Sequence, residues 1–125
     1  MKFAIFGDVH SNLEALNAVL EDARSHDCTH FVCIGDIVGY NANPSECLDV
    51  IQKLDCPVVK GNHDEEASLD TELVGLNPLA QKSMQWTRDN LDLNQKKYLK
   101  ELKLARHVGD FTIVHATLDL SLIHI

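Results

Sequence analysis

Short apolar runs that end in metal-binding residue types constrain the fold of this chain most strongly. The runs span residues 3–7, 31–35, 57–61 and 111–114. They are followed by Asp8 and His10, by Asp36, by Asn62, His63 and Asp64, and by His115. Each run is too short for a helix, which is typical of buried strands. Because open α/β sheets bind ligands beyond the carboxyl ends of their strands, the four ends predict one shared site.

Helical patterns lie between the first three runs. Ser11 and Glu14 predict a capping box in front of a leucine stripe, and Asn43–Pro44 predicts the start of a second helix. The order strand–helix–strand–helix–strand has crossovers long enough for parallel pairing. We therefore predict the α/β class, with a mostly parallel sheet flanked by helices.

The pattern changes after Asp64. Residues 65–77 are polar and ambiguous, whereas Asn77–Pro78 and Asn94 predict the starts of two further helices. Gly109–Asp110 separates two apolar runs and predicts a tight hairpin.

Composition narrows the class of protein. With 125 residues and 45% hydrophobic content, the chain is sized for one domain. Its net charge of -8 argues against nucleic acid as a partner, because phosphates would be repelled. The four cysteines form no C-x-x-C pair, which favours reduced thiols and a cytoplasmic location over a disulfide or a cysteine zinc site. We find no signal peptide or membrane span in the sequence.

The residues at the strand ends suit transition-metal chemistry. In an extended segment the side chains of Asp8 and His10 would share a face and reach one ion. A carboxylate with an imidazole favours Mn, Fe, Zn, Ni or Co over Mg or Ca. Asp36 has two oxygens and can bridge two ions, while Asn62 and His115 offer an amide oxygen and a ring nitrogen. Two such ions would clamp a phosphoryl group and activate water. The competing interpretation is that the acidic and amide residues only cap helices.

The motifs also resemble those of a known family. Residues 7–10, 35–39, 61–64 and 115–117 are similar to four motifs of the calcineurin-like metallophosphoesterase superfamily. Residues 11–16 and 38–40 resemble its bacterial and archaeal single-domain branch. Tyr40, directly after the second motif, is a candidate to line the site.

The resemblance implies a role for each matching residue. It implies Asp8 and His10 as ligands of a first metal, Asn62 and His115 as ligands of a second, and Asp36 as the bridge. It further implies that His63 stabilises the transition state or protonates the leaving oxygen, and that Asp64 orients His63.

One family motif has no counterpart in the chain. The family ends with a G-H-x-H motif and a second sheet, and nothing after His115 matches them. We therefore expect a metallophosphoesterase domain over residues 1–119, forming an incomplete half of the two-sheet sandwich, and a truncated or non-native tail over 120–125. His124 could replace a missing ligand, in its own chain or in a partner chain. Apolar faces of the hairpin and the tail predict a homo-oligomer.

The predicted function is hydrolysis of small phosphodiesters or phosphomonoesters by water activated between two divalent transition metal ions. The alternative is a metal-binding remnant without turnover that serves as a structural or regulatory module. A flavodoxin-like phosphate binder is a third hypothesis, but the chain has no Gly-rich loop.

Overall fold

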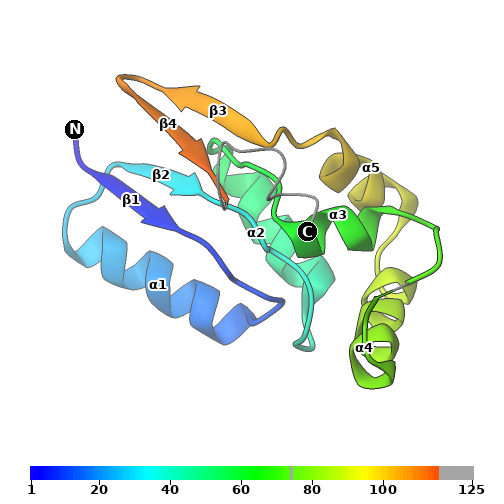
Figure 1. Cartoon of the computed structure of the whole chain (residues 1–125). Coiled ribbons are helices and arrows are strands. Elements are labelled where there is room, and N and C mark those ends of the chain that lie inside the picture. The colour runs from blue at the N-terminus through cyan, green and yellow to red at the C-terminus, as the bar shows by residue number, and fades with distance from the viewer. Residues whose placement is uncertain (74, 116–125) are drawn as a thin grey trace.

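The computed structural model describes residues 1–73 and 75–115. Helices and strands follow one another in this order: β1 (Phe3–Phe6), α1 (Leu13–Ser25), β2 (His30–Cys33), α2 (Pro44–Leu54), α3 (Asn62–Ser68), α4 (Pro78–Asp89), α5 (Leu93–Glu101), β3 (Ala105–Val108) and β4 (Phe111–Val114) (Figure 1). The predicted α/β class is confirmed. The predicted tail at 120–125, His124 and the end of the fourth motif at 116–117 lie outside the described residues.

A parallel strand pair carries the first two motifs. β1 and β2 pair from Phe3 opposite His30 to Phe6 opposite Cys33. α1 connects them, as the crossover between parallel strands requires. Because the two strands are parallel, their carboxyl ends lie at the same end of the sheet, and the loops that follow them start side by side.

The predicted third strand over 57–59 is present only as isolated bridges. Val58 pairs in parallel with Cys33, and Val59 pairs with Lys103. Pro57 has no N–H to donate, so a longer ladder cannot extend backwards through it. The segment nevertheless lies beside β2 in the predicted direction.

The predicted hairpin is confirmed as a separate antiparallel pair. β3 and β4 pair from Ala105 opposite Val114 to Val108 opposite Phe111. Gly109 turns the chain with a positive φ of 56°, a conformation that glycine adopts without steric cost.

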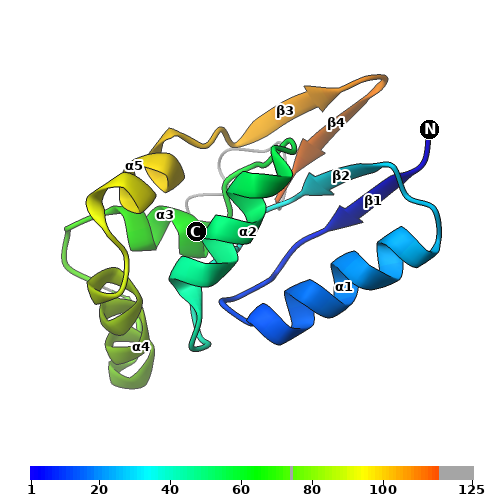
Figure 2. The ribbon, with the colours of Figure 1, turned by 180° about the vertical axis from the view of Figure 1, so that it is seen from behind.

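The core lies on both faces of the β1–β2 pair. On β2 the side chains of Phe31 and Cys33 belong to the larger cluster, which includes the buried leucines of α1 and α2. Val32, between them, belongs to a smaller cluster with Ile113 of β4. This alternation follows from the two-residue period of a strand. Accordingly α1 and the hairpin lie on opposite sides of the pair in both views (Figures 1 and 2).

The predicted cap of α1 at Ser11 is wrong, because Asn12 caps this helix. The Asn12 side chain accepts a hydrogen bond from the N–H of Ala15 at 3.0 Å. Ser11 has a φ of 61°, and its own N–H donates to the carbonyl of Ile37 at 2.8 Å. A residue held in the left-handed region by a neighbouring loop cannot take the extended conformation of an N-cap.

The other helix starts agree more closely with prediction. α2 and α4 begin at Pro44 and Pro78, and the Asn77 side chain caps α4. The predicted start of α5 at Asn94 is wrong by two residues, because Asp92 and Gln95 form the reciprocal capping box there.

We predict that the chain self-associates through the edge of β1. Among the described residues β1 pairs only with β2, and the side chain of Ile5 is 55% exposed. An open edge with apolar side chains favours pairing between chains, and a lysine on it disfavours pairing. Light scattering at micromolar concentration should give a mass above that of a monomer, and Ile5→Lys should lower it.

Val19→Lys is the matched control. Val19 is 45% exposed and lies on α1 rather than on a strand, so its replacement should leave the mass unchanged. A monomeric parent chain would contradict the prediction.

Candidate metal centre

Three backbone hydrogen bonds hold the loops after β1 and β2 together. The N–H groups of Asp8 and His10 donate to the carbonyls of Gly35 and Asp36, both at 2.9 Å. The Ser11 N–H donates to the next carbonyl of the same loop. These bonds bring the side chains of Asp8 and His10 beside Asp36.

The backbone at these ligand-type residues is left-handed. Asp8, His10 and Asp36 have φ values of 53°, 47° and 57°. The predicted extended geometry of residues 8–10 is therefore wrong, although Asp8 and His10 still approach each other, with Asp8 Oδ1 4.0 Å from His10 Nε2. Non-glycine residues rarely adopt such a backbone, and they keep it only where surrounding contacts maintain the strain, as at functional sites.

The N-terminus of α3 contributes to the site together with the loops after β1 and β2. This helix begins at Asn62, within a segment whose sequence gave no helical pattern beyond Asp64. The His63 N–H donates to Asp36 Oδ1 at 3.0 Å, so the Asp36 carboxylate sits at the positive end of the helix. A side chain on Gly61 would collide with Asp36, which explains the glycine there.

Asp64 anchors the loop that carries Asp36. Its side chain is fully buried. It accepts hydrogen bonds from the backbone N–H groups of Asp36 at 2.8 Å, Ile37 at 2.9 Å, Val38 at 3.3 Å and Gly61 at 3.0 Å. Burial raises the pKa of the Asp64 carboxyl to about 6, against the opposite effect of these hydrogen bonds.

The structure shows no hydrogen bond between the Asp64 carboxylate and the His63 ring, so the implied role of Asp64 in orienting His63 stays a prediction. The hydrogen bonds described for the Asp64 carboxylate all go to backbone N–H groups, and the His63 ring is hydrogen-bonded to Asp36 instead. The position of Asp64 at the third residue of α3 directs its carboxylate into the core, below the Asp36 loop.

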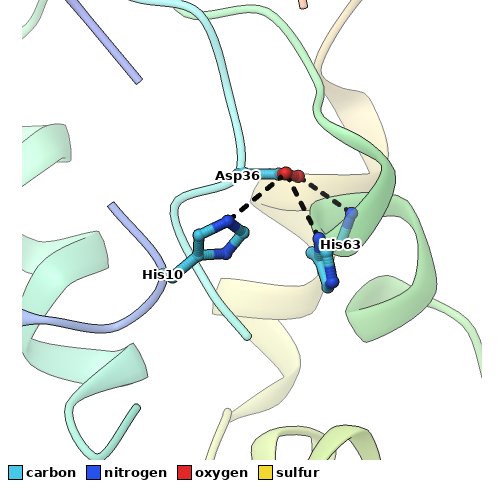
Figure 3. Close-up of side chains that lie close together, drawn as sticks. All are labelled: His10, Asp36 and His63. Atoms are coloured by element: carbon cyan, nitrogen blue, oxygen red, sulfur yellow. Dashed lines mark hydrogen bonds and ion pairs between the residues drawn. The ribbon is translucent and has the colours of Figure 1, made fainter. Parts of the chain in front are cut away.

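Three imidazoles converge on one oxygen of Asp36. Asp36 Oδ2 lies 3.2 Å from His63 Nδ1, 3.2 Å from His115 Nε2 and 3.7 Å from His10 Nε2. Figure 3 shows His10 and His63 approaching the Asp36 carboxylate from two different segments. Asp36 is 4% exposed, so little solvent is available to separate these groups.

The ring of His115 is held in the tautomer of a metal ligand. Its Nδ1 lies 2.7 Å from the carbonyl oxygen of Ile34. A carbonyl only accepts hydrogen bonds, so Nδ1 carries the proton. In the neutral ring Nε2 then has a free lone pair, which faces the Asp36 carboxylate. Two electron-rich atoms at this distance require a cation or a further proton between them.

His10 repeats the same arrangement. Its Nδ1 lies 3.3 Å from the carbonyl oxygen of Val38, and its Nε2 faces Asp36 and Asp8. Backbone carbonyls that fix a histidine tautomer in this way are typical partners of metal-binding imidazoles.

His63 is bound differently from the other two imidazoles. Its Nδ1, rather than Nε2, faces Asp36, and the ionised carboxylate only accepts. Nδ1 therefore carries the proton, and Nε2 is left for another partner. The hydrogen bond to Asp36 raises the pKa of His63, although burial opposes this.

The pKa of Asp36 reflects its neighbours. Burial raises the pKa of Asp36, but hydrogen bonds from the ring and the backbone N–H of His63 outweigh burial and lower this pKa overall. Asp36 is therefore ionised at neutral pH and available as a ligand.

The side chains fit one or two divalent ions. His10, Asp36 and His63 form one compact group, and Asp8, Asp36 and His115 form another. Metal–ligand bonds of about 2.0–2.2 Å place neighbouring ligand atoms roughly 3–3.5 Å apart, close to the spacing around Asp36. This grouping differs from the implied one, which paired Asp8 with His10. Asn62 is exposed at the first position of α3.

Comparison with known proteins identifies the family of the chain. Residues 1–124 match the family described as calcineurin-like phosphoesterase. The chain belongs to this family.

Two relatives share more than a third of their aligned residues with this chain. An uncharacterised protein of Methanocaldococcus jannaschii, MJ0912, is 42% identical over 101 residues, which are 81% of this chain and 42% of that protein. A crystal structure of a metallophosphoesterase from Sphaerobacter thermophilus is 37% identical, with a TM-score of 0.76 over 90% of this chain and 45% of that one.

A third structure shares the fold alone. The hypothetical protein PH1004 from Pyrococcus horikoshii is 19% identical, with a TM-score of 0.76 over 88% of this chain and 52% of that one. The chain thus spans about half the length of these three relatives, and its fold is about half of the fold in the two structures.

The cysteines take no part in this site. All four are free in the structure, so the alternative of a disulfide is wrong. Burial raises the pKa of the Cys33 and Cys47 thiols to about 12, which keeps them protonated and unsuited to metal binding.

We predict that Asp36→Asn removes both metals at once. Asp36 is common to both groups of ligands, and an amide cannot supply two anionic oxygens. The loss in affinity should exceed the ~10–100-fold typical of residues that only support a ligand. Metal content after loading with Mn²⁺ and gel filtration measures it. Asp22→Asn, at an exposed position on α1, is the control. Two ions retained at unchanged affinity would show that Asp36 is not a bridge.

We predict that Asp64→Asn destabilises the fold by about 1–3 kcal/mol, because an amide nitrogen would face backbone N–H groups and leave donors unsatisfied. Urea denaturation of the metal-free protein measures this change. Asp110→Asn in the exposed hairpin turn is the control. Unchanged stability would mean that the four hydrogen bonds do not hold the loop.

Proposed function

We propose that the chain is a metal-dependent phosphoesterase that hydrolyses small phosphodiesters or phosphomonoesters. One observation carries the proposal. His10 and His115 are both held by backbone carbonyls in the tautomer that leaves Nε2 free, and both Nε2 atoms face the same buried carboxylate. A structural cluster of neutral imidazoles would not turn lone pairs toward an anion.

Asp36, His10, His115 and Asp8 would hold two divalent transition metal ions. When bound, such ions bind phosphate oxygens and lower the pKa of a water molecule between them. Asp36 would join His10 to Asp8 and His115 as the shared ligand, and it fixes the His63 ring through Nδ1. Asn62, at the exposed start of α3, is available to complete the shell with its amide oxygen.

His63 would serve as the general acid. With Nδ1 hydrogen-bonded to Asp36, the Nε2 atom is the one that can carry and donate a proton. In the metal-free site the hydrogen bond to Asp36 raises the pKa of His63. Donation from Nε2 to the departing oxygen would prevent an alkoxide from forming.

The acidic chain limits the substrates. A net charge of -8 repels extended nucleic acids, so we propose small phosphoesters. Among the described residues no helix is long and apolar enough to cross a membrane. The free cysteines support a reducing, cytoplasmic compartment as part of the proposal.

A metal-binding module without turnover is the second candidate. The chain spans about half the length of its relatives, which favours this alternative. Metal content and hydrolysis of bis(p-nitrophenyl) phosphate, measured on the same Mn²⁺-loaded preparation, separate the two. Tight metal binding with no hydrolysis would support the module and contradict the enzyme.

We predict that His63→Ala keeps the metals but lowers turnover by about 10²–10⁴-fold, the usual contribution of a general acid. The loss should be smaller for p-nitrophenyl esters than for alkyl esters, since a good leaving group needs less protonation. His107→Ala, in the exposed hairpin, is the matched control. Loss of metal in His63→Ala would make His63 a ligand instead.

A further inference from the structure

An exposed tyrosine stands beside the metal centre. Residues 35–39 are all buried, whereas Tyr40, the next residue, is 62% exposed. Neither apolar cluster of the described residues includes its ring. Packing of the core therefore does not account for an aromatic side chain at this position.

The backbone holds Tyr40 in a strained conformation. Its φ is 67°, in the left-handed region that bulky residues rarely adopt. Asn41 keeps it there, because its N–H donates to the carbonyl of Gly39 at 2.9 Å and its side-chain amide donates to the carbonyl of His10 at 2.9 Å. Tyr40 is thus fixed to the same loop that supplies a metal ligand.

The Tyr40 ring contacts the two imidazoles of the site that lie nearest to it. Its centroid is 4.9 Å from that of His10 and 4.7 Å from that of His63, with interplanar angles of 63° and 57°. The two imidazoles are themselves 4.9 Å apart (Figure 3). One side of the tyrosine is therefore supported by the site, and much of the ring remains open to solvent.

We propose that Tyr40 is a specificity-determining residue that stacks on an aromatic group, such as a nucleobase or aryl ring, carried by the phosphoester substrate. This inference rests on the proposed function. A phosphate bound at Asp36 would lie next to His63, so its substituent would extend past the ring that contacts His63. Aromatic stacking needs no charge, which suits a chain whose acidic groups repel anions.

Two probes that share a phosphate test the inference. Adenosine 5′-monophosphate and ribose 5-phosphate differ by the base, and calorimetry measures the Kd of each for the Mn²⁺-loaded full chain. The nucleotide should bind about 10-fold more tightly, the order of one base–aromatic stack. Tyr40→Leu should abolish this ratio by weakening nucleotide binding, while the Kd of ribose 5-phosphate stays unchanged.

Two further variants separate the ring from other effects. Tyr40→Phe keeps the ring and should keep the ratio, which a hydroxyl-based contact would not allow. Trp86→Leu, an exposed aromatic residue on α4, should leave the ratio unchanged. Metal content of Tyr40→Leu should equal that of the parent chain, because Tyr40 contacts His10 without binding the ion.

The outcomes are distinct. Equal Kd values for the two probes in the parent chain, or a ratio that survives Tyr40→Leu, would overturn the role of Tyr40 and leave the proposed function standing. Failure of the Mn²⁺-loaded chain to bind either probe would overturn the proposed function and this inference with it.

Discussion

A fully buried carboxylate, that of Asp64, links the parts of the molecule that must meet at the site. An ionised group in the interior is stable only when its oxygens are satisfied by hydrogen bonds. Here the partners are backbone N–H groups from the loop after β2 and from the start of α3. The same bonds that satisfy Asp64 therefore fix the position of Asp36, and through Asp36 they fix the ring of His63. The geometry of the site depends on this anchor.

Backbone carbonyls determine which ring nitrogen carries the proton in two of the imidazoles. Ile34 and Val38 flank Asp36 in sequence, and their carbonyl oxygens lie next to the Nδ1 atoms of His115 and His10. One loop thus supplies both the carboxylate and the groups that set two tautomers. His63 is oriented by the carboxylate itself, which gives it a different chemistry within the same cluster. The rings of His10 and His115 thus present Nε2 to Asp36, whereas the ring of His63 presents Nδ1.

Sequence patterns predicted the elements whose signals are local. The strands β1 and β2, the hairpin at Gly109 and the proline starts of α2 and α4 depend on residues within a few positions, and the structure contains them. The third predicted strand is present only as isolated bridges. The failures arise where distant contacts decide. Asn12 caps α1 in place of Ser11, because the loop after β2 fixes the backbone of Ser11 through a hydrogen bond to Ile37. The start of α3 is stabilised by Asp36, a residue far away in sequence, so the polar pattern around it gave no sign of a helix.

At the candidate site, too, some features could be predicted from the sequence, and others depend on contacts between distant residues. Strand-end residues could be expected to converge, because parallel topology places those ends together. The role of Asp64 could not be derived, because a D-E pattern after His63 does not reveal which backbone groups its carboxylate will meet. The tautomers of His10 and His115 likewise depend on carbonyls from another loop.

The left-handed residues of the two loops have a consequence for how such a sequence can change. Asp8, His10, Asp36 and Tyr40 each occupy a conformation that costs a non-glycine residue about 1–2 kcal/mol. Glycine at any of these positions would relieve that cost while deleting the side chain. These four side chains therefore carry a cost in stability, and all four lie at the candidate site. At these four positions the backbone conformation that places the side chain at the site also lowers the stability of the fold.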